Sequence, residues 1–487
     1  MARIPGRPSV REPVSEAPES LFGRDEKQVF LALILCVGVA AALPFPPVKY
    51  GLALVLGLVY ARQLVDRPDL ALAMYILALP VIDLLPPNII PVMGLNPQTL
   101  LVFSLLFRMF REPSRRRGLD PFTPGLVIFT IALIVGSLVS VFQHGYSPFE
   151  LFTRAKNHII VIPMLYFAER VIVTDKQKKL VLLAMGLLLF LMSAHTIWTT
   201  RDQIAAGLLL ERHRAVGLVA SQANLYGGWL AMMILASICF LFSSVLKGKT
   251  RIFLAGTTFM AMVALVYTLS RGAWIALVLA LGVVAIFRNR RILLLGTAVF
   301  FLLPALVSPT VRDRAASILH VLDTVEDGSE GVAGALSGAP ETADESAMVR
   351  VLQWRALGGL MAQAPIFGHG YDYFPQLWAD EGHEMKAAHS SYIEIGTELG
   401  SFGLLGYLAL VLPVLFLGWS TSGRGHPPLQ RAIGTAAFGM ALCLMILDTS
   451  GTRFRNSEVM ANFWIFAGLV SGAAVETQRR EPNPASR

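Results

Sequence analysis

The sequence has little charge and almost no cysteine for its length. Only 15% of its 487 residues are Asp, Glu, Lys or Arg, whereas soluble domains carry about 25%, so a soluble globular fold is excluded. The three cysteines lie in apolar runs without metal-ligand spacing and are interpreted as small buried hydrophobes. The sequence also lacks a glycine-rich phosphate loop and a close histidine pair, so no motif indicates a nucleotide cofactor or a metal; we expect neither.

What the sequence does contain is a series of long apolar runs. Hydrophobic residues make up 54% of the chain, and a helix of about 20 apolar residues crosses a bilayer. Up to fourteen candidate spans are centred near residues 36, 57, 77, 103, 131, 162, 188, 233, 260, 279, 299, 405, 439 and 467. The second, fourth and sixth are the weakest, and twelve spans is an alternative count. The predicted fold is all-α: a polytopic integral membrane protein with about 12–14 transmembrane helices.

The net charge of +8 is explained by membrane orientation rather than by nucleic-acid binding, for which no soluble domain is present. With the N-terminus inside and alternating spans, every strong basic cluster falls on one side, as the positive-inside rule requires. These clusters are Arg108, Arg111 and Arg115–Arg117; Lys176, Lys178 and Lys179; Lys247, Lys249 and Arg251; Arg288, Arg290 and Arg291; and Arg479, Arg480 and Arg487. We therefore expect both termini to be cytoplasmic.

The predicted organisation has five parts. Residues 1–27 form a flexible cytoplasmic tail, 28–307 an N-terminal transmembrane bundle, 308–390 a periplasmic loop or lid, 391–475 the C-terminal transmembrane helices and 476–487 a second cytoplasmic tail. The first half of the loop is acidic and rich in Gly and Ala. Residues 347–363 have apolar positions at helical spacing, which predicts an amphipathic helix there. A loop of this length is typical of a lid or binding element.

Several arginines fall on the outer side, against the bias that orients the chain. They include Arg214, Arg271, Arg453 and Arg455, and His389 lies on the same side. Ionisable groups near the membrane are costly unless they pair or face water, and guanidinium matches phosphate oxygens, so an anionic ligand such as a lipid diphosphate explains the exception. The alternatives are that Arg271 only extends to the headgroups, and that Arg214 pairs with a neighbour such as Glu211. Arg212 and His213 compete with Arg214 for its role.

His389 precedes a predicted helix start. A neutral imidazole can accept a proton near neutral pH. Ser391 and Glu394 fit a capping box, and Glu398 shares a helical face with Glu394, where negative charge suits the helix dipole. One interpretation is that these residues only finish a helix end. The other is that His389 is a base that Glu394 orients.

These residues and their surroundings resemble the O-antigen ligase and polymerase family of bacterial envelope glycosyltransferases. The resemblance covers roughly residues 200–420. The residues that carry it are Arg214–Gly217, Ser270–Trp274, Arg350 through Gly370, His389–Glu394 and Glu398–Gly400, continuing into Gly403–Gly406. Ser390 stands where the family often has asparagine, and Ser221–Asn224 replaces its usual Asn-Pro-Asn.

The resemblance implies a metal-independent transfer of a glycan from an undecaprenyl diphosphate carrier at the periplasmic face of the bacterial inner membrane. It assigns Arg214 and Arg271 to the diphosphate, with Arg350 as a further contact, and His389 to the acceptor hydroxyl. Arg212, Tyr392, Glu394 and Glu398 are supporting candidates. The implied acceptor is another glycan or lipid A–core, and other polysaccharide-assembly proteins are candidate partners.

Three functions compete at this point. Ligase and polymerase share the donor and differ only in the acceptor; the long outer loop and extra spans slightly favour a polymerase or exopolysaccharide role. A flippase or transporter without transferase chemistry is the alternative from another class, although its signature would be broken helices in matching halves and charges at mid-span. A scaffold in an envelope assembly complex would tolerate loss of the key side chains.

Overall fold

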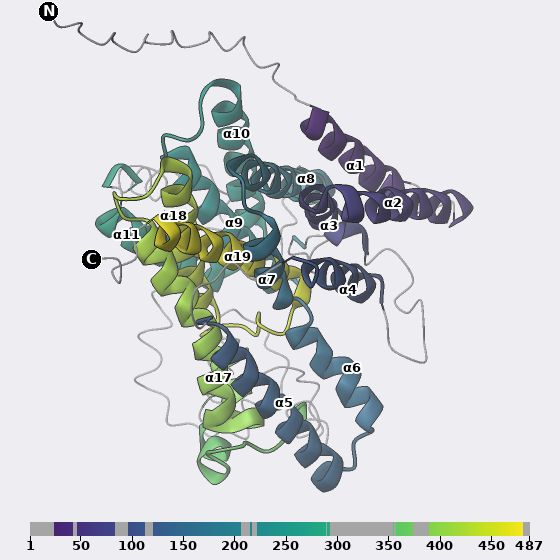
Figure 1. The fold of residues 1–487 in the computed structure, drawn as a ribbon. Helices are drawn as coiled ribbons and strands as arrows, with labels where there is room; N and C mark the ends of the chain where they lie inside the picture. The colour runs from purple at the N-terminus through teal and green to yellow at the C-terminus, as the bar shows by residue number, and fades with distance from the viewer. Residues whose placement is uncertain are drawn as a thin grey trace, which may run out of the picture.

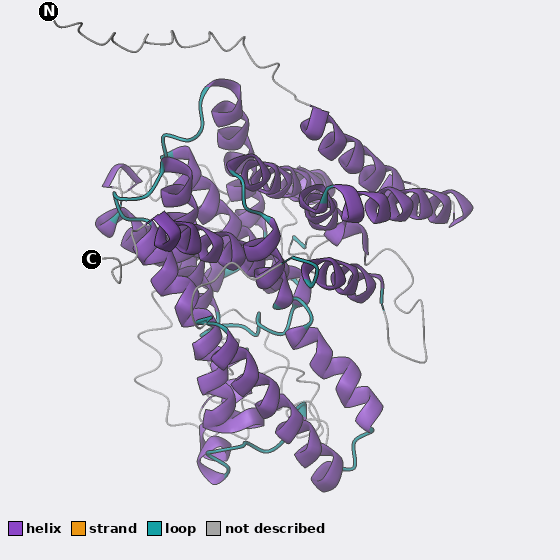
Figure 2. Ribbon diagram, viewed as in Figure 1, coloured by secondary structure: helices purple, strands orange, loops and turns teal. Residues whose placement is uncertain are grey.

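The computed structural model describes residues 24–41, 46–82, 96–112, 120–205, 215–216, 222–288, 290–292, 354, 357–373 and 389–480. Within these ranges the regular structure is helical, and no strand occurs (Figure 2). The helices are α1 (Arg24–Ala41), α2 (Pro46–Asp66), α3 (Pro68–Ile82), α4 (Pro97–Met109), α5 (Thr123–His144), α6 (Pro148–Ile159), α7 (Pro163–Val171), α8 (Asp175–Ala205), α9 (Ala223–Leu241), α10 (Gly248–Tyr267), α11 (Arg271–Phe287), α17 (Ser391–Thr421), α18 (Pro428–Leu447) and α19 (Ser457–Arg480).

The predicted all-α polytopic architecture is confirmed. Among the described residues, seven helices are long and apolar enough to cross a membrane: α5, α8, α9, α10, α17, α18 and α19. Four shorter apolar helices accompany them, within α1, α3, α4 and α11. Most of α19 is buried, whereas α5 exposes large apolar side chains such as Phe142 along its length. Burial of α19 and exposure of α5 to the bilayer are consistent with central and peripheral positions in a membrane bundle.

The predicted span near residue 162 is two helices rather than one. The first, α6, ends at Ile159, and α7 starts at Pro163, whose fixed φ suits a first helical turn. Arg154 and His158 share one face of α6 because they are four residues apart. This helix is thus amphipathic: His158 is buried, whereas Arg154 is about half exposed and extends from the same face to the buried Asp372.

The helix α17 is broken at Gly400, where φ is 67°. In a straight helix Ser391 and Tyr407 would lie about 24 Å apart, yet both hydroxyls donate to the carboxylate of Asp448. The segment before Gly400 therefore folds back along the segment after it. Figure 1 shows α5 running beside the longer, second part of α17. Only glycine accepts this conformation readily.

A loop from the lid region forms hydrogen bonds with the backbone on both sides of this break. The backbone N–H groups of His369 and Gly370 donate to the carbonyl groups of Thr397 and Glu398 at the end of the first segment. The N–H groups of Ser401 and Phe402, at the start of the second, donate to the carbonyl groups of Pro365 and Ile366. Helix ends leave such groups without intrahelical partners, so the loop 365–370 stabilises a reversal that would otherwise be costly. Residues 357–363 before it are helical, as predicted.

The bundle has two chemically different ends. At one, which we call the basic end, the buried ammonium of Lys178 pairs with Glu476 at 2.6 Å, Arg67 pairs with Asp25 and Asp69, and Arg288 lies over the ring of Trp419. These contacts join the start of α8 to the end of α19, the start of α1 to the start of α3, and the end of α11 to the end of α17. The opposite end carries the starts of α11, α17 and α19 and is called the site end.

Candidate functional site

The start of α17 is fixed by Asp448, the residue that follows α18. Ser390 is the N-cap, and its hydroxyl accepts the N–H of Ile393. The backbone N–H of Ser391 donates to the carbonyl oxygen of Asp448 at 2.9 Å, and its hydroxyl donates to the Asp448 carboxylate at 2.7 Å. The predicted capping box of Ser391 and Glu394 was therefore wrong by one residue, because Asp448 takes the Ser391 hydroxyl as a donor.

The Asp448 carboxylate is completely buried and holds two hydroxyl groups. Besides Ser391 it accepts the phenol of Tyr407 at 2.6 Å. Burial raises the pKa of Asp448 to about 6, and the hydrogen bond from Tyr407 limits the rise because it favours the charged form. This carboxylate thus joins both segments of the broken helix to the end of α18.

His389 stands directly before this anchored start. Its φ is 53°, a left-handed conformation that histidine visits more readily than most residues but still at a cost. Its side chain is half-buried. The bonds of Ser390 and Ser391 to Asp448 hold the chain on the C-terminal side of His389, so the orientation of the imidazole depends on the Asp448 cluster.

Arg271 opens α11 at the same end. Leu269, two residues earlier, has φ of 51°, which is a marked departure for a residue with a bulky side chain. Gly272 lies against the hydroxyl of Ser450, so closely that a Cβ would displace it. The starts of α11 and α17 are therefore both packed on residues 448–451. This contact brings the predicted residues Arg271 and His389 to one region of the bundle.

The remaining predicted arginines, Arg212, Arg214 and Arg350, lie outside the described residues. The neighbour of Arg214, Ala215, donates its N–H to the carbonyl of Tyr267 at 3.1 Å, four residues before Arg271. The backbone at position 215 thus reaches the turn between α10 and α11.

Arg453, which the sequence places on the outer side, is buried and links two helix ends of this region. Its side chain is 1% exposed and its guanidinium donates to the backbone carbonyl groups of Leu447 and Asn224. Gly228 and Gly451 leave the space that it fills. The residue links the start of α9 to the end of α18, and so acts on the shape of the site rather than on a ligand.

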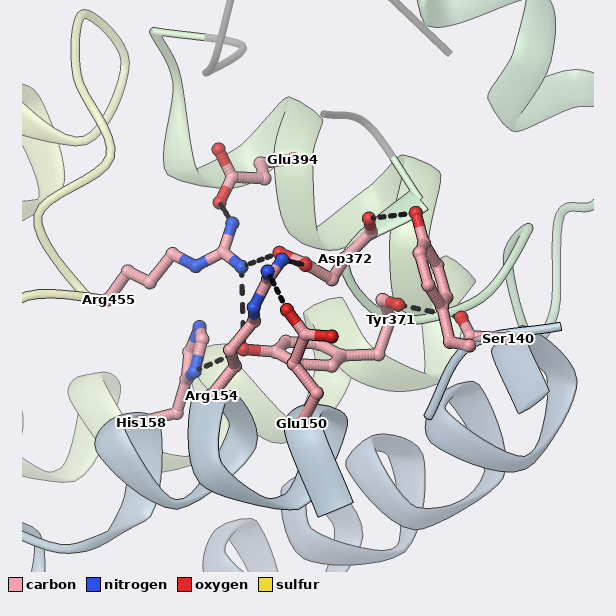
Figure 3. Close-up of polar contacts among 9 residues, drawn as sticks. Ser140, Glu150, Arg154, His158, Tyr371, Asp372, Glu394 and Arg455 are labelled. Atoms are coloured by element: carbon pink, nitrogen blue, oxygen red, sulfur yellow. Dashed lines mark hydrogen bonds and ion pairs between the residues drawn. The ribbon is translucent and has the colours of Figure 1, made fainter. Parts of the chain in front are cut away.

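Arg455 is the centre of a second polar network, shown in Figure 3. Its guanidinium pairs with Glu394 at 2.9 Å and with Asp372. Asp372 also accepts from Arg154 of α6, which pairs in turn with the exposed Glu150. The surrounding carboxylates raise the pKa of Arg455 further above its ordinary value against the opposing effect of burial. The network connects four separate segments: α6, the loop 365–373, the start of α17 and the chain before α19.

His158 and Tyr371 complete the network on its buried side. The Tyr371 hydroxyl lies 3.2 Å from Nδ1 of His158 and also accepts from Arg455. Burial, together with the charge of Arg455, lowers the pKa of His158 to about 3. This imidazole is therefore neutral at any physiological pH and acts as a hydrogen-bonding partner of the Tyr371 hydroxyl.

The described supporting candidates, Tyr392, Glu394 and Glu398, lie in the first segment of α17. Tyr392 donates its hydroxyl to the carbonyl of Met445 at 2.9 Å, which makes it part of the contact with α18. Glu394 has Arg455 as its described partner. Glu398 is 3% exposed and its Oε1 has no hydrogen-bond partner among the described residues. Glu394 and Glu398 share a face as expected, and that face is turned toward Arg455 rather than toward water.

Sequence reasoning missed Asp448, Asp372 and Arg154. Asp448 follows the largely apolar run 432–447 and looks like an ordinary loop residue. Arg154 and Asp372 are more than two hundred residues apart, so no local spacing could pair them. One signal was available, because Arg154 is a further arginine on the side where arginine is unexpected.

Within the described residues, no group of three or more histidine, cysteine or carboxylate side chains is arranged to hold a metal ion. None of the curated proteins compared with the chain matches it. Residues 256–408 match the family described as O-antigen ligase, a stretch that runs from α10 through the lid region into the second segment of α17. The resemblance found in the sequence is confirmed over that stretch: residues 256–408 of this integral membrane protein are similar to the O-antigen ligase family.

Proposed function

We propose that the protein is a metal-independent, inverting glycosyltransferase that acts at the periplasmic face of the bacterial inner membrane. It transfers a glycan from an undecaprenyl diphosphate carrier to an acceptor hydroxyl, in the polymerisation or ligation of O-antigen or exopolysaccharide. Both termini are cytoplasmic in this proposal, so the site end faces the periplasm. Arg214, Arg271 and Arg350 bind the diphosphate, and His389 is the base.

One observation carries the proposal. The starts of α11 and α17, which bear Arg271 and His389, both pack on residues 448–451, and they lie in the stretch that matches the ligase family. A permanent cation and a titratable imidazole in one region at the end of a membrane bundle suit a lipid diphosphate, whose headgroup lies at the interface.

The chemistry is a single displacement. The acceptor oxygen attacks the anomeric carbon and forms the new glycosidic bond, while the bond from that carbon to the diphosphate oxygen breaks and the diphosphate leaves with the electron pair. His389 takes the proton of the acceptor hydroxyl. Arginines aimed at the diphosphate stabilise its developing charge, which is often the largest contribution to catalysis. Attack from the side opposite the leaving group inverts the anomeric centre.

The test is transfer by the purified full-length protein with a defined lipid-linked oligosaccharide and candidate acceptors, in the presence of EDTA. His389→Ala is expected to retain carrier binding and to lose about 10²–10⁴-fold in turnover, the usual contribution of a general base. His426→Ala, at the basic end, is the matched control and should transfer normally. Near-normal transfer by His389→Ala would show that the base is another group.

Two further measurements separate the remaining functions. Deletion of a polymerase leaves single repeat units, whereas deletion of a ligase leaves long chains on the carrier. In reconstituted vesicles, a flippase would move a labelled lipid-linked donor across the bilayer without consuming it. Translocation without any transfer to an acceptor would replace the transferase proposal with the transporter.

A further inference from the structure

The polar network around Arg455 contacts the helical segment that directly follows His389. This is the first segment of α17, residues 391–399. Only Ser390 separates it from His389, and the Ser390 hydroxyl donates to the carbonyl oxygen of Asp448 at 3.1 Å. Because the connection is one residue long, the direction of the imidazole follows any movement of the segment.

The first segment of α17 is held on two nearly opposite faces. Tyr392 donates its hydroxyl to the carbonyl oxygen of Met445, near the end of α18, at 2.9 Å. Glu394 comes two residues later, about 200° further around the helix, and accepts from the guanidinium of Arg455 at 2.9 Å. Together the two contacts oppose rotation of the segment about its own axis, and loss of either weakens that restraint.

Arg455 can restrain Glu394 because its own guanidinium is held in place (Figure 3). One terminal nitrogen binds Glu394 and the other binds Asp372, whose side chain is 3% exposed. The Tyr371 hydroxyl lies 3.4 Å from the second nitrogen, and the Tyr371 ring centre lies 5.4 Å from the guanidinium carbon. A planar guanidinium holds two carboxylates at a fixed separation, which the single nitrogen of a lysine cannot do.

The chain between α18 and α19 contacts the first segment of α17 at two points. Asp448 binds the hydroxyl of Ser391 at its start, and Arg455 binds Glu394 three residues further on. Two points on one short stretch of chain define both the position and the rotation of the segment. This stretch lies outside residues 256–408, so the similarity to the ligase family assigns it no role.

A small rotation of the segment is enough to affect a reaction. Side-chain ends lie about 5–6 Å from a helix axis, since a helix with its side chains is about 10–12 Å across. A rotation of about 10° therefore moves such a group by about 1 Å, and a misplacement of that size can lower a rate about 100-fold.

We infer that Arg455 is a positioning residue of the reaction: it sets the rotation of the first segment of α17 and thereby the direction of the His389 imidazole. The inference rests on the proposed function, in which His389 is the base. Arg455 acts through Glu394 rather than on a substrate. Its replacement therefore lowers kcat and leaves donor binding nearly unchanged.

The decisive variant is Arg455→Lys, which keeps the positive charge between Asp372 and Glu394 but has one nitrogen for two carboxylates. Arg154→Lys is its matched control, because Arg154 also binds Asp372 and pairs otherwise with Glu150 rather than with Glu394. Both variants are made in the full-length protein and assayed with a defined lipid-linked oligosaccharide and an acceptor.

We expect Arg455→Lys to lower kcat about 10–100-fold, with KM for the donor changed by less than about twofold. Arg154→Lys should keep both kcat and KM near those of the unsubstituted protein. A normal kcat in Arg455→Lys, or an equal loss in Arg154→Lys, would overturn the inference.

A double variant tests whether Arg455 acts through Glu394. Glu394→Gln alone should also lower kcat, and the variant that combines it with Arg455→Lys should lose no more than the larger of the two single losses, because both changes remove one contact. Losses that multiply would show that Arg455 affects the reaction by another route, and the inference would fail.

A measurement that does not depend on transfer separates this inference from the proposed function. Diethyl pyrocarbonate modifies neutral imidazoles, and its rate at His389 is followed by mass spectrometry near neutral pH, with His426 as the internal reference; both side chains are half-buried. The rate at His389 relative to His426 should change in Arg455→Lys and stay the same in Arg154→Lys. An unchanged rate in Arg455→Lys would overturn the inference. If the unsubstituted protein transfers no glycan and the rate still changes in this way, the proposed function fails while positioning by Arg455 stands.

Discussion

The two ends of the helix bundle are built differently. At the basic end, ion pairs join neighbouring helix ends, as Lys178 with Glu476 and Arg67 with Asp25 and Asp69 do. At the site end, three residues other than glycine, Leu269, Asp372 and His389, have φ between 51° and 61°, and α17 is broken at Gly400. Strained backbone of this kind persists only where surrounding contacts impose it, and it gathers at functional sites.

The polar groups of the two ends also differ in what they hold. At the basic end, Lys178 and Arg67 pair with carboxylates of neighbouring helix ends, an arrangement that stabilises the bundle. At the site end, Asp448 binds backbone and hydroxyl groups at the helix start beside His389, and Asp372 fixes the loop that satisfies the break in α17. The difference indicates that charge at the first end serves stability, whereas at the second it serves the position of particular atoms.

The largest expected effect comes from Gly400→Ala. The new side chain would meet the carbonyl of Ile366 and would also hold φ at 67° against its preference, a cost of at least about 1–3 kcal/mol. We expect lower thermal stability in detergent and loss of transfer, because the start of α17 moves. Gly256→Ala is the control in α10, where nothing lies within 4 Å; it should gain up to about 1 kcal/mol. Equal stability of the two variants would argue against a strained break.

The second prediction compares two buried carboxylates, one from each end. Asp448→Asn should lower kcat about 10–100-fold with little change in KM for the donor, since a small displacement of His389 is enough for such a loss. Glu476→Gln should leave kcat per folded molecule nearly intact and lower the free energy of unfolding by about 1–3 kcal/mol, because it leaves Lys178 buried without its full partner. Both quantities come from steady-state kinetics and thermal unfolding on the same preparations.

The opposite results for the two variants would contradict this difference between the two ends. If Asp448→Asn only destabilised the protein and its folded fraction kept full kcat, Asp448 would be a structural anchor like Glu476. If Glu476→Gln lowered kcat without a change in stability, the basic end would be coupled to the reaction.

Sequence predicts the two ends unequally well. The helices of the bundle follow from apolar runs of membrane-spanning length, and the basic clusters mark one end. The break in α17 was not predictable, because Gly400 is one of several glycines there, with Gly396, Gly403 and Gly406 close by, and an isolated glycine is usually tolerated inside a helix. What turns it into a reversal is a loop more than thirty residues earlier, through bonds that involve Pro365 and Gly370.

The candidate site likewise contains residues that the sequence indicated and residues that it did not. Arg271 and His389 became candidates because each departs from a local expectation, a cation on the outer side or a histidine at a helix start. No local feature of the sequence distinguishes Asp448 and Asp372 from ordinary loop residues. Their importance comes from tertiary contacts, with Ser391 and Tyr407 in one case and with Arg154 and Arg455 in the other.

The smallest expected effect is a dependence of stability on pH that originates in His158. Its pKa is about 3 in the folded protein and 6.5 when solvated, so between these values the unfolded chain binds the proton and the folded protein does not. Stability contributed by the neutral imidazole is complete above pH 6.5 and decreases as pH falls, by about 2 kcal/mol at pH 5. Asp448 acts in the opposite sense, since its pKa is raised to about 6.

The contribution of His158 is isolated by comparison with His158→Gln, which keeps a hydrogen-bonding group beside Tyr371 and cannot titrate. The melting temperatures of the two proteins are measured from pH 8 to pH 5. Their difference should be constant between pH 8 and pH 7, where the imidazole is neutral in both states, and should then shift in favour of the variant as the solution becomes more acidic. A difference that stays constant down to pH 5 would mean that the folded protein also protonates His158. The imidazole would then have access to water, and the network around Arg455 would be open at the site end.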